Sequence, residues 1–275
     1  IMLCAHWDTR PWADSDPDKA NHYKPVPGAN DGGSGVGILL EIARQLSQVP
    51  TALGVDIILF DAEDYGRHAD EWRDAVEGEE TWALGSKHWA HNTHVKNYKA
   101  RFGILLDIIG APNSTFYLGG YSMQYAREIV AKVWNCANRL GYSKYFKMYE
   151  GGLITDDHVH VNRILGIPCI DIINCDPQSP NGFGPHHHTV KDNMDWIDAF
   201  ERNFKCNSTN LFTSKEYTSY RNRNRKWKIN SNPDAIAKID SLKGMIKTAT
   251  KDGLLFIPGG SFYVRSATPE EKQLL

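Results

Sequence analysis

An ordered series of carboxylate and imidazole side chains runs along the first two thirds of the chain: His6, Asp31, Glu63, Asp64, Asp107 and His188. Several of them stand directly after short apolar runs, where strands of a sheet would end. Carboxylate and imidazole are the ligands that zinc accepts when thiolates are absent. Taken singly, each carboxylate is also explained as a helix cap or a turn former. Taken together, the series favours a zinc site with acid–base chemistry beside it.

The adjacent carboxylates Glu63 and Asp64 predict two different roles. Successive residues after a strand point to opposite sides, so one metal ion cannot use both equally. We expect one carboxylate to bind the metal and the other to move protons. Further along, the run from His186 to His188 offers imidazoles for a metal, although a solvated loop explains its first two histidines as well.

The elements that must position these side chains are predicted from short apolar runs that alternate with longer segments of helical period. The predicted strands are Ile1–Ala5, Val55–Phe60, Gly103–Ile108 and Cys169–Ile173. The predicted helices are Ser34–Gln48 and Ser122–Leu140. This alternation is typical of a three-layer α/β sandwich, whose central mixed sheet is mostly parallel, twisted and covered by helices. Ligands gather at the carboxyl ends of strands in such sheets, which is where the polar series falls.

Composition excludes several classes of protein. The chain has 275 residues, of which 41% are hydrophobic and 23% charged, so disorder throughout is excluded. Its sequence contains no run of the roughly 18 apolar residues that a membrane span requires. The five cysteines are widely spaced and form no CxxC pair, so neither a disulfide framework nor a thiolate zinc site is predicted.

The charge pattern divides the chain. Residues 1–200 hold 17 Lys and Arg against 26 Asp and Glu, whereas residues 201–275 hold 14 against 7. All 11 histidines lie in the first part, so any imidazole chemistry belongs there. We therefore predict a catalytic domain over residues 1–198 and a basic C-terminal segment, residues 199–275, to which the sequence assigns no function.

The C-terminal segment still has local patterns. Arg221–Lys228 is strongly basic, but a solvated surface explains this run better than binding to nucleic acid, which is not expected as a partner. Asn232 followed by proline predicts a helix start, and Leu254–Pro258 is strand-like.

Eight motifs in the predicted catalytic domain carry a resemblance to a known family. They are CAHWDTRP (4–11), GANDGGSGVG (28–37), FDAEDYG (60–66), LGSKHWA (84–90), LLDIIGAPNSTF (105–116), TDDH (155–158), GIPCIDII (166–173) and HHTVKDN (187–193). With them the chain resembles the zinc-dependent glutaminyl-peptide cyclotransferases of animal type, in particular their bacterial members, which share the fold of the co-catalytic zinc aminopeptidases. The GAPN loop and the additional Asp156 distinguish the cyclase pattern from the aminopeptidase pattern.

The resemblance implies a role for each matching position. One zinc ion per chain would be bound by Asp31, Asp64 and His188. The proton carrier would be Glu63, and the acidic hydrogen-bond pair beside it would be Asp107 and Asp156. The residues lining the substrate pocket would be Ile154, Thr155, Phe183, His187 and Trp72.

The sequence also departs from the family pattern. The family usually has tryptophan immediately before the zinc-binding histidine, and this chain has His187 there. The helix and edge strands that precede the first strand in the family are not found, which leads us to expect an exposed sheet edge. A closing amphipathic helix after the last loop is also missing from the pattern.

The resemblance implies that the chain converts the N-terminal glutamine of peptides or proteins to pyroglutamate with release of ammonia. It also implies a periplasmic or secreted enzyme. Two alternatives stay open. A two-zinc aminopeptidase would use His6 and Asp107 with Asp31 as a second metal site. A catalytically inactive homologue would bind zinc without turnover.

Overall fold

The computed structural model describes residues 1–47, 53–71, 80–175, 179 and 181–197, together with the backbone of residues 72–74, 254–256 and 262–265. Its strands are β1 (Met2–His6), β2 (Asp56–Phe60), β3 (Gly103–Asp107), β4 (Phe116–Leu118), β5 (Phe146–Glu150), β6 (Cys169–Ile173), β7 (Leu254–Phe256) and β8 (Phe262–Arg265). The α-helices are α1 (Gly33–Leu46), α2 (Leu84–His91), α3 (Gly120–Arg139) and α4 (Asp157–Leu165). Two 3-10 helices are η1 (Lys19–Asn21) and η2 (Ala69–Asp74).

The central sheet has the strand order β6-β3-β1-β2-β8-β7. The four strands β6, β3, β1 and β2 are parallel, whereas β8 pairs antiparallel with β2 and β7 antiparallel with β8. The register aligns His6 with Phe60 and Asp107 with Ile173, so these pairs of parallel strands end together. The mostly parallel, mixed sheet and its four predicted strands are therefore confirmed.

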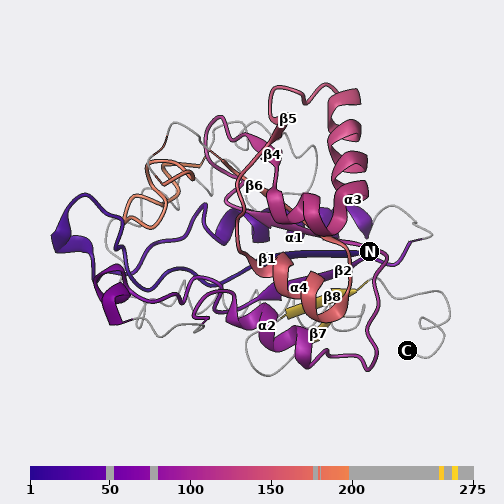
Figure 1. The fold of residues 1–275 in the computed structure, drawn as a ribbon, viewed down its shortest axis with the longest axis horizontal. Helices are drawn as coiled ribbons and strands as arrows, with labels where there is room; N and C mark the ends of the chain where they lie inside the picture. The colour runs from indigo at the N-terminus through magenta and orange to yellow at the C-terminus, as the bar shows by residue number, and fades with distance from the viewer. Residues whose placement is uncertain are drawn as a thin grey trace.

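Helices cover both faces of this sheet, α1 and α3 on one face and α2 and α4 on the other (Figure 1). Alternation along β1 explains the arrangement, because Leu3 packs in the core below α1 and α3 while Met2 and Cys4 pack in the core with α2 and α4. The predicted three-layer sandwich is confirmed.

The two predicted covering helices are present with small differences. In α1, Leu39 is fully buried, whereas Leu40, which a helical period places next to it on the apolar side, is 54% exposed. Leu40 lies at the edge of the apolar stripe, which is completed instead by Ile38 and Ile42. In α3 the backbone leaves helical geometry at Ala126, where φ is −142°.

A second, two-stranded sheet pairs β4 with β5 in parallel and was not predicted from the sequence. The strand β4 has three residues, too few to show a period. This small sheet matters for the site, because the chain that leaves β5 leads directly to Ile154, Thr155 and Asp156 before α4 begins.

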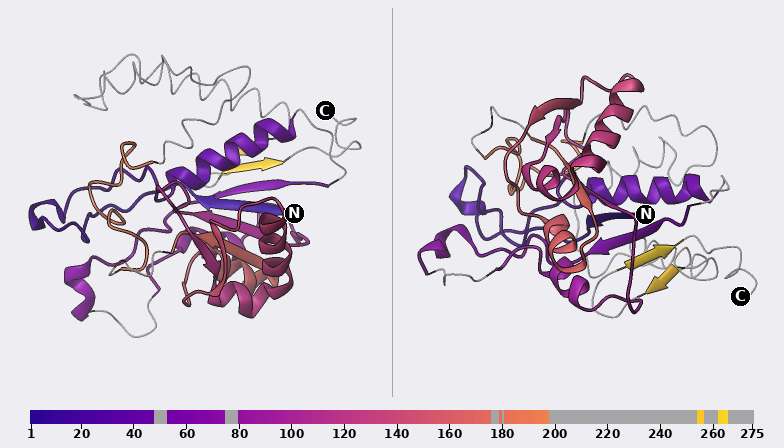
Figure 2. Two further views of the ribbon diagram at one scale, coloured as in Figure 1. Left: turned by 90° about the horizontal axis from the view of Figure 1, so that it is seen from above. Right: turned by 45° about the vertical axis from the view of Figure 1, so that its right-hand side comes forward.

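The C-terminal segment contributes β7 and β8 to the sheet (Figure 2). The strand predicted at Leu254–Pro258 is confirmed over residues 254–256, whereas β8 was not predicted. Because β8 pairs with β2, that side of β2 is not the exposed edge that the missing family elements suggested. The basic run Arg221–Lys228 and the helix predicted after Asn232 lie outside the described residues, and the domain division at residue 198 stays a prediction.

Among the residues that the structure describes, none of the helices combines the length and apolar character needed to cross a membrane.

Candidate zinc and acid–base site

A cavity of about 370 Å³ opens at the carboxyl ends of the parallel strands. It is lined by Asp31, Glu63, Asp64, Trp82, Asp107, Ile154, Thr155, Asp156, Ile173, Phe183, His187 and His188. Ten of the twelve residues predicted from the sequence line this cavity. Of the other two, His6 contacts residues of its wall, and the side chain of Trp72 lies outside the described part of the chain.

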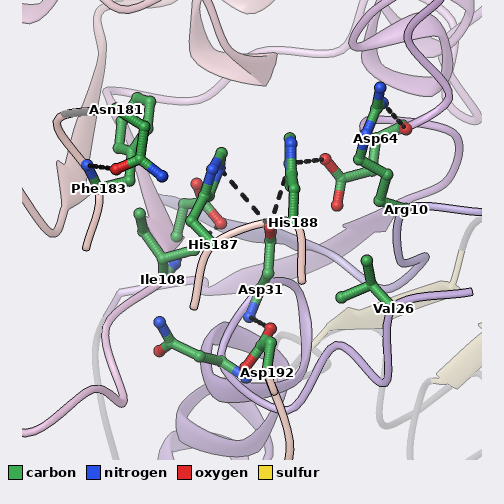
Figure 3. A network of polar contacts seen from close by, with 12 residues as sticks. Arg10, Val26, Asp31, Asp64, Ile108, Asn181, Phe183, His187, His188 and Asp192 are labelled. Atoms are coloured by element: carbon green, nitrogen blue, oxygen red, sulfur yellow. Dashed lines mark hydrogen bonds and ion pairs between the residues drawn. The ribbon is translucent and has the colours of Figure 1, made fainter. Parts of the chain in front are cut away.

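Asp31 stands in the turn immediately before α1 and is 3% exposed. Its backbone N–H donates to Asp192 Oδ2 at 3.0 Å, and the N–H of Asn30 donates to Asp192 Oδ1 at 2.9 Å. The following Gly32 has φ of +83°, and a Cβ there would lie 2.5 Å from the carbonyl oxygen of Asp8. The turn is thus held rigidly, with the Asp31 carboxylate aimed into the cavity (Figure 3).

His188 faces two carboxylates at once. Its Nε2 lies 3.0 Å from Asp64 Oδ1 and 3.4 Å from Asp31 Oδ2 (Figure 3). Burial disfavours the imidazolium, but the close contacts and charges of the two carboxylates outweigh it and raise the pKa of His188 to about 9. The imidazole of His188 thus links the carboxylates of Asp31 and Asp64.

The same three side chains fit a zinc ion. Asp31 Oδ2 and Asp64 Oδ2 are buried without a hydrogen-bond partner, which is costly unless a cation or a proton balances them. Zinc–ligand distances of about 2.0–2.1 Å in a tetrahedron place neighbouring ligand atoms roughly 3.3 Å apart. The 3.0 Å and 3.4 Å separations at His188 bracket that value. By their chemistry, and by the distance of each carboxylate from the imidazole, Asp31, Asp64 and His188 suit a zinc ion.

His6 lies fully buried behind this set. Its Nε2 is 3.2 Å from Asp31 Oδ1 and 3.0 Å from Asp107 Oδ1, and its Nδ1 is 3.4 Å from Asp8 Oδ1. Burial opposes its charge, but hydrogen bonds to Asp107, Asp31 and Asp8 raise the pKa of His6 well above its usual value. The spacing of His6, Asp31 and Asp107 also suits a second cation, so the number of ions is not set by geometry.

Glu63 is 9% exposed and lines the cavity beside Asp64. Burial, followed by the charges of Asp64 and Asp156, raises the pKa of Glu63 well above its usual value. A carboxyl group with a raised pKa can both accept and return a proton near neutral pH, which is what a general acid–base requires.

Asp107 and Asp156 line the same cavity, but each carboxylate hydrogen-bonds elsewhere. Asp107 Oδ1 contacts His6 and accepts from the N–H of Ile108, whereas Asp156 caps α4 by accepting from the N–H of Asp157. Burial and then the charge of Asp107 raise the pKa of Asp156 well above its usual value. The charge of each residue therefore acts on the other, and their pairing by a hydrogen bond stays a prediction.

Two residues that sequence reasoning did not assign position the Glu63–Asp64 loop. The carboxylate of Asp8 accepts from the N–H of Glu63 and from the N–H of Asp64, both at 3.1 Å. Arg10, which is 2% exposed, donates to the carbonyl oxygen of Asp64 at 3.0 Å and pairs with Asp14. The only sequence signal for them was their place in the motif after the first strand.

The Arg10–Asp14 pair leads to a pH-dependent prediction. Burial disfavours the Asp14 carboxylate, but the hydrogen bond and charge of Arg10 outweigh it, so the pKa of Asp14 lies below its usual value. Asp14→Ala removes the carboxylate partner of the buried guanidinium, which keeps its bonds to backbone carbonyl oxygens, and is expected to lower the free energy of unfolding by roughly 1.5 to 3 kcal/mol at pH 7. Because a depressed pKa stabilises the fold only above the unfolded value of about 3.9, this difference should shrink as the pH falls below roughly 4.

The measurement is urea unfolding of both proteins, with chelator present, at several pH values between neutral and acidic. The exposed Asp18→Asn serves as the control and should follow the wild type throughout. A difference between Asp14→Ala and wild type that stays constant with pH would contradict the role of the ion pair.

The predicted substrate-pocket residues Ile154, Thr155, Phe183 and His187 all line the cavity. Sequence reasoning missed Trp82, whose ring stacks parallel to that of His188 with centroids 5.8 Å apart. No strand end or motif marked it, because its loop is brought to the site only by folding. The lining of the cavity thus combines apolar and aromatic side chains with acidic ones.

Comparisons with known proteins identify the fold and its relatives. The sequence model of Peptidase family M28 matches residues 1–204. Among solved structures, the glutaminyl cyclase of Tannerella forsythia is 56% identical with a TM-score of 0.68, covering 72% of this chain and 67% of that one. A Zn-dependent exopeptidase from Parabacteroides distasonis is 52% identical with a TM-score of 0.69, covering 72% and 66%.

The aminopeptidase YwaD of Bacillus subtilis is 26% identical over 201 residues, which are 72% of this chain and 36% of that protein. The chain therefore spans about a third of this relative and about two thirds of the two solved structures. The resemblance to bacterial glutaminyl cyclases is confirmed, and the zinc-dependent exopeptidase among its neighbours supports zinc as the metal. By the match over most of its length, this chain belongs to Peptidase family M28.

Proposed function

We propose that this chain is a zinc-dependent glutaminyl cyclase, an acyltransferase that converts the N-terminal glutamine of peptides or proteins to pyroglutamate and ammonia. The observation that carries the proposal is a buried Glu63 with a raised pKa beside the zinc-compatible set Asp31, Asp64 and His188. The likeness to solved glutaminyl cyclases at 50% to 56% identity supports it. We also propose a periplasmic or secreted location, as the family resemblance implies.

The reaction is intramolecular. The α-amine of the substrate's glutamine forms a bond to its own side-chain carbonyl carbon, the bond from that carbon to the amide nitrogen breaks, and ammonia leaves. The enzyme supplies no nucleophile, so holding the extended glutamine in a bent conformation is a large part of its task. The apolar side chains of Ile154, Phe183 and Trp82, which line the cavity, suit the methylene groups of the glutamine side chain.

The acidic side chains that line the cavity transfer the proton. Glu63 takes a proton from the attacking amine and returns it to the departing nitrogen. Asp156 favours the protonated form of Glu63 by its charge, and Asp107 acts in the same way on Asp156. Asp31, Asp64 and His188 would hold one zinc ion, whose positive charge would stabilise the negative charge that develops on the amide oxygen.

The test is to incubate the purified, zinc-loaded chain with an unblocked peptide that starts with glutamine, and to follow ammonia release and peptide mass together. Loss of one ammonia from a peptide that stays otherwise intact is the expected result. A peptide of the same sequence starting with alanine is the matched control, because it has no side-chain amide and should remain unchanged.

A two-zinc aminopeptidase is the second candidate. The observation that favours it is the spacing of His6, Asp31 and Asp107, which suits a second cation, together with relatives described as exopeptidases. The same assay separates the two, because an aminopeptidase would release the first amino acid from the alanine peptide. Zinc binding without either product would identify an inactive homologue.

A further inference from the structure

We propose that Ser34 is a positioning residue for Asp107: its buried hydroxyl anchors the loop after β3 in a strained conformation that aligns the Asp107 carboxylate with His6. The inference rests on the proposed function and adds a residue to its acid–base machinery. Ser34 lies in the first turn of α1, three residues after Asp31, and is 6% exposed.

The backbone is strained at the residue that follows Asp107. Ile108 has φ of +39°, in the left-handed region, where a β-branched side chain is rare. Such a conformation persists only where the surrounding contacts hold it. The N–H of Ile108 donates to Asp107 Oδ1 at 2.8 Å. Because φ is the rotation about the N–Cα bond, it sets how the peptide group that carries this N–H is oriented relative to the residues that follow.

Side chains hold the residues that follow. Three successive N–H groups, those of Ile108, Ile109 and Gly110, donate to side-chain oxygens. Ser34 Oγ accepts from Ile109 at 3.0 Å, and its hydroxyl donates to the carbonyl oxygen of Asn30 at 2.6 Å. Asn30 Oδ1 accepts from Gly110 at 2.7 Å. Since a buried N–H requires an acceptor, the hydroxyl of Ser34 fixes the place of Ile109.

Two glycines let the start of α1 approach this loop. A Cβ at Gly35 would lie 2.4 Å from the carbonyl oxygen of Leu106, and a Cβ at Gly110 would lie 2.8 Å from the Cβ of Ser34. Both distances are too short for atoms that are not bonded, since carbon atoms pack at about 3.5–4.0 Å. The absence of side chains at both positions therefore brings the serine hydroxyl within reach of the N–H of Ile109.

Asp107 connects this loop to the charges of the site. Its Oδ1 lies 3.0 Å from His6 Nε2, which is also 3.2 Å from Asp31 Oδ1. Without the hydroxyl of Ser34, Ile108 is free to return to a negative φ. The peptide group between Asp107 and Ile108 then rotates, and the carboxylate loses its alignment with His6.

This loss should slow the chemical step without releasing the metal ligands. The charge of Asp107 acts on Asp156, whose charge acts in turn on Glu63, the proposed proton carrier. The turn of Asp31 keeps its own support, because Asp192 still accepts from the N–H of Asp31. Ser34 therefore acts through Asp107 and touches neither the substrate nor the metal.

The first measurement compares steady-state cyclisation by zinc-loaded wild type and Ser34→Ala, a change that removes the hydroxyl and little volume. The turnover number should fall about 10-fold or more, as expected when a group beside the chemistry is misplaced. KM and the zinc affinity, measured by competition with a chelator, should stay unchanged. Ser114→Ala is the matched control. Ser114 is equally buried, and its hydroxyl also donates to a backbone carbonyl oxygen, that of Ala111 at 2.8 Å.

A double-mutant cycle tests whether Ser34 acts through Asp107. Asp107→Asn removes the charge that the loop aligns, so Ser34→Ala should lower the turnover number no further in that background. Effects that are independent would multiply instead. Ser114→Ala should leave the turnover number unchanged in both backgrounds.

A crystal structure of Ser34→Ala separates this inference from the proposed function. Residue 108 should have a negative φ, and Asp107 Oδ1 should no longer lie within hydrogen-bond distance of His6 Nε2. An unchanged loop, or effects that multiply in the double variant, would overturn the inference, and cyclisation by the wild type would then leave the proposed function standing. A wild type that does not cyclise, together with a rearranged loop in Ser34→Ala, would overturn the function and retain the positioning role.

Discussion

Replacing Glu63 by glutamine is expected to lower the turnover number for cyclisation by about 10²- to 10⁴-fold while zinc stays bound. The amide has nearly the same size and shape as the carboxyl group but cannot take a proton from the attacking amine. The variant leaves the contacts of His188 with Asp31 and Asp64 in place, so zinc affinity should be unaffected. The measurement combines steady-state ammonia release with zinc content of the same preparation.

Glu150→Gln is the matched control for this variant. Glu150 is exposed at the end of β5, so the same change in chemistry there should leave the turnover number unchanged. A Glu63→Gln protein that retains zinc and cyclises within a few-fold of wild type would show that another group moves the proton. The next candidate would be Asp156, which is buried in the same cavity and also has a raised pKa.

Asp31→Asn is expected to weaken zinc binding by more than about 100-fold, because changing residues that only support a metal's ligands already costs 10- to 100-fold. Asp31 is the carboxylate that both His6 and His188 face, so its loss removes a metal ligand and the counter-charge for two imidazoles. Cyclisation should fall with the zinc content. Chelator competition gives the affinity, and added zinc should restore activity only at concentrations above the new dissociation constant.

Asp18→Asn is the control. Asp18 is exposed and caps the short helix η1, and its carboxylate accepts a hydrogen bond from the N–H of Ala20. Its zinc affinity should equal that of wild type. If Asp31→Asn still holds zinc as tightly as wild type, the ion is bound by a different set, and the group formed by His6, Glu63 and Asp64 would be the one to examine.

The sequence by itself determined the four parallel strands and the residues that end them. Fully buried strands are continuous apolar runs that stand out from their surroundings, and polar residues after such runs are placed at one edge of a parallel sheet by topology alone. The motifs carried the rest of the prediction, because residues of the same type in the same order imply the same ligand roles. For this reason ten of the residues that line the cavity were predictable from the sequence.

The tertiary structure decided what supports those residues. Asp192 holds the turn of Asp31 from 161 positions away along the chain, and Trp82 stacks on His188, although neither lies near its partner in sequence. The pairing of β8 with β2 is likewise a long-range contact. A local sequence pattern does not reveal this pairing, because β8 is short and its partner strand is distant in the sequence. Contacts of this kind depend on distances in space, and periodicity reports only the nearest neighbours along the chain.

The direction of a side chain is also decided in three dimensions. The sequence shows His187 and His188 as neighbours, and alternation would send them to opposite sides. The left-handed backbone at His188 turns both toward Asp31, because the folded loop over-determines a conformation that the residue would not choose alone.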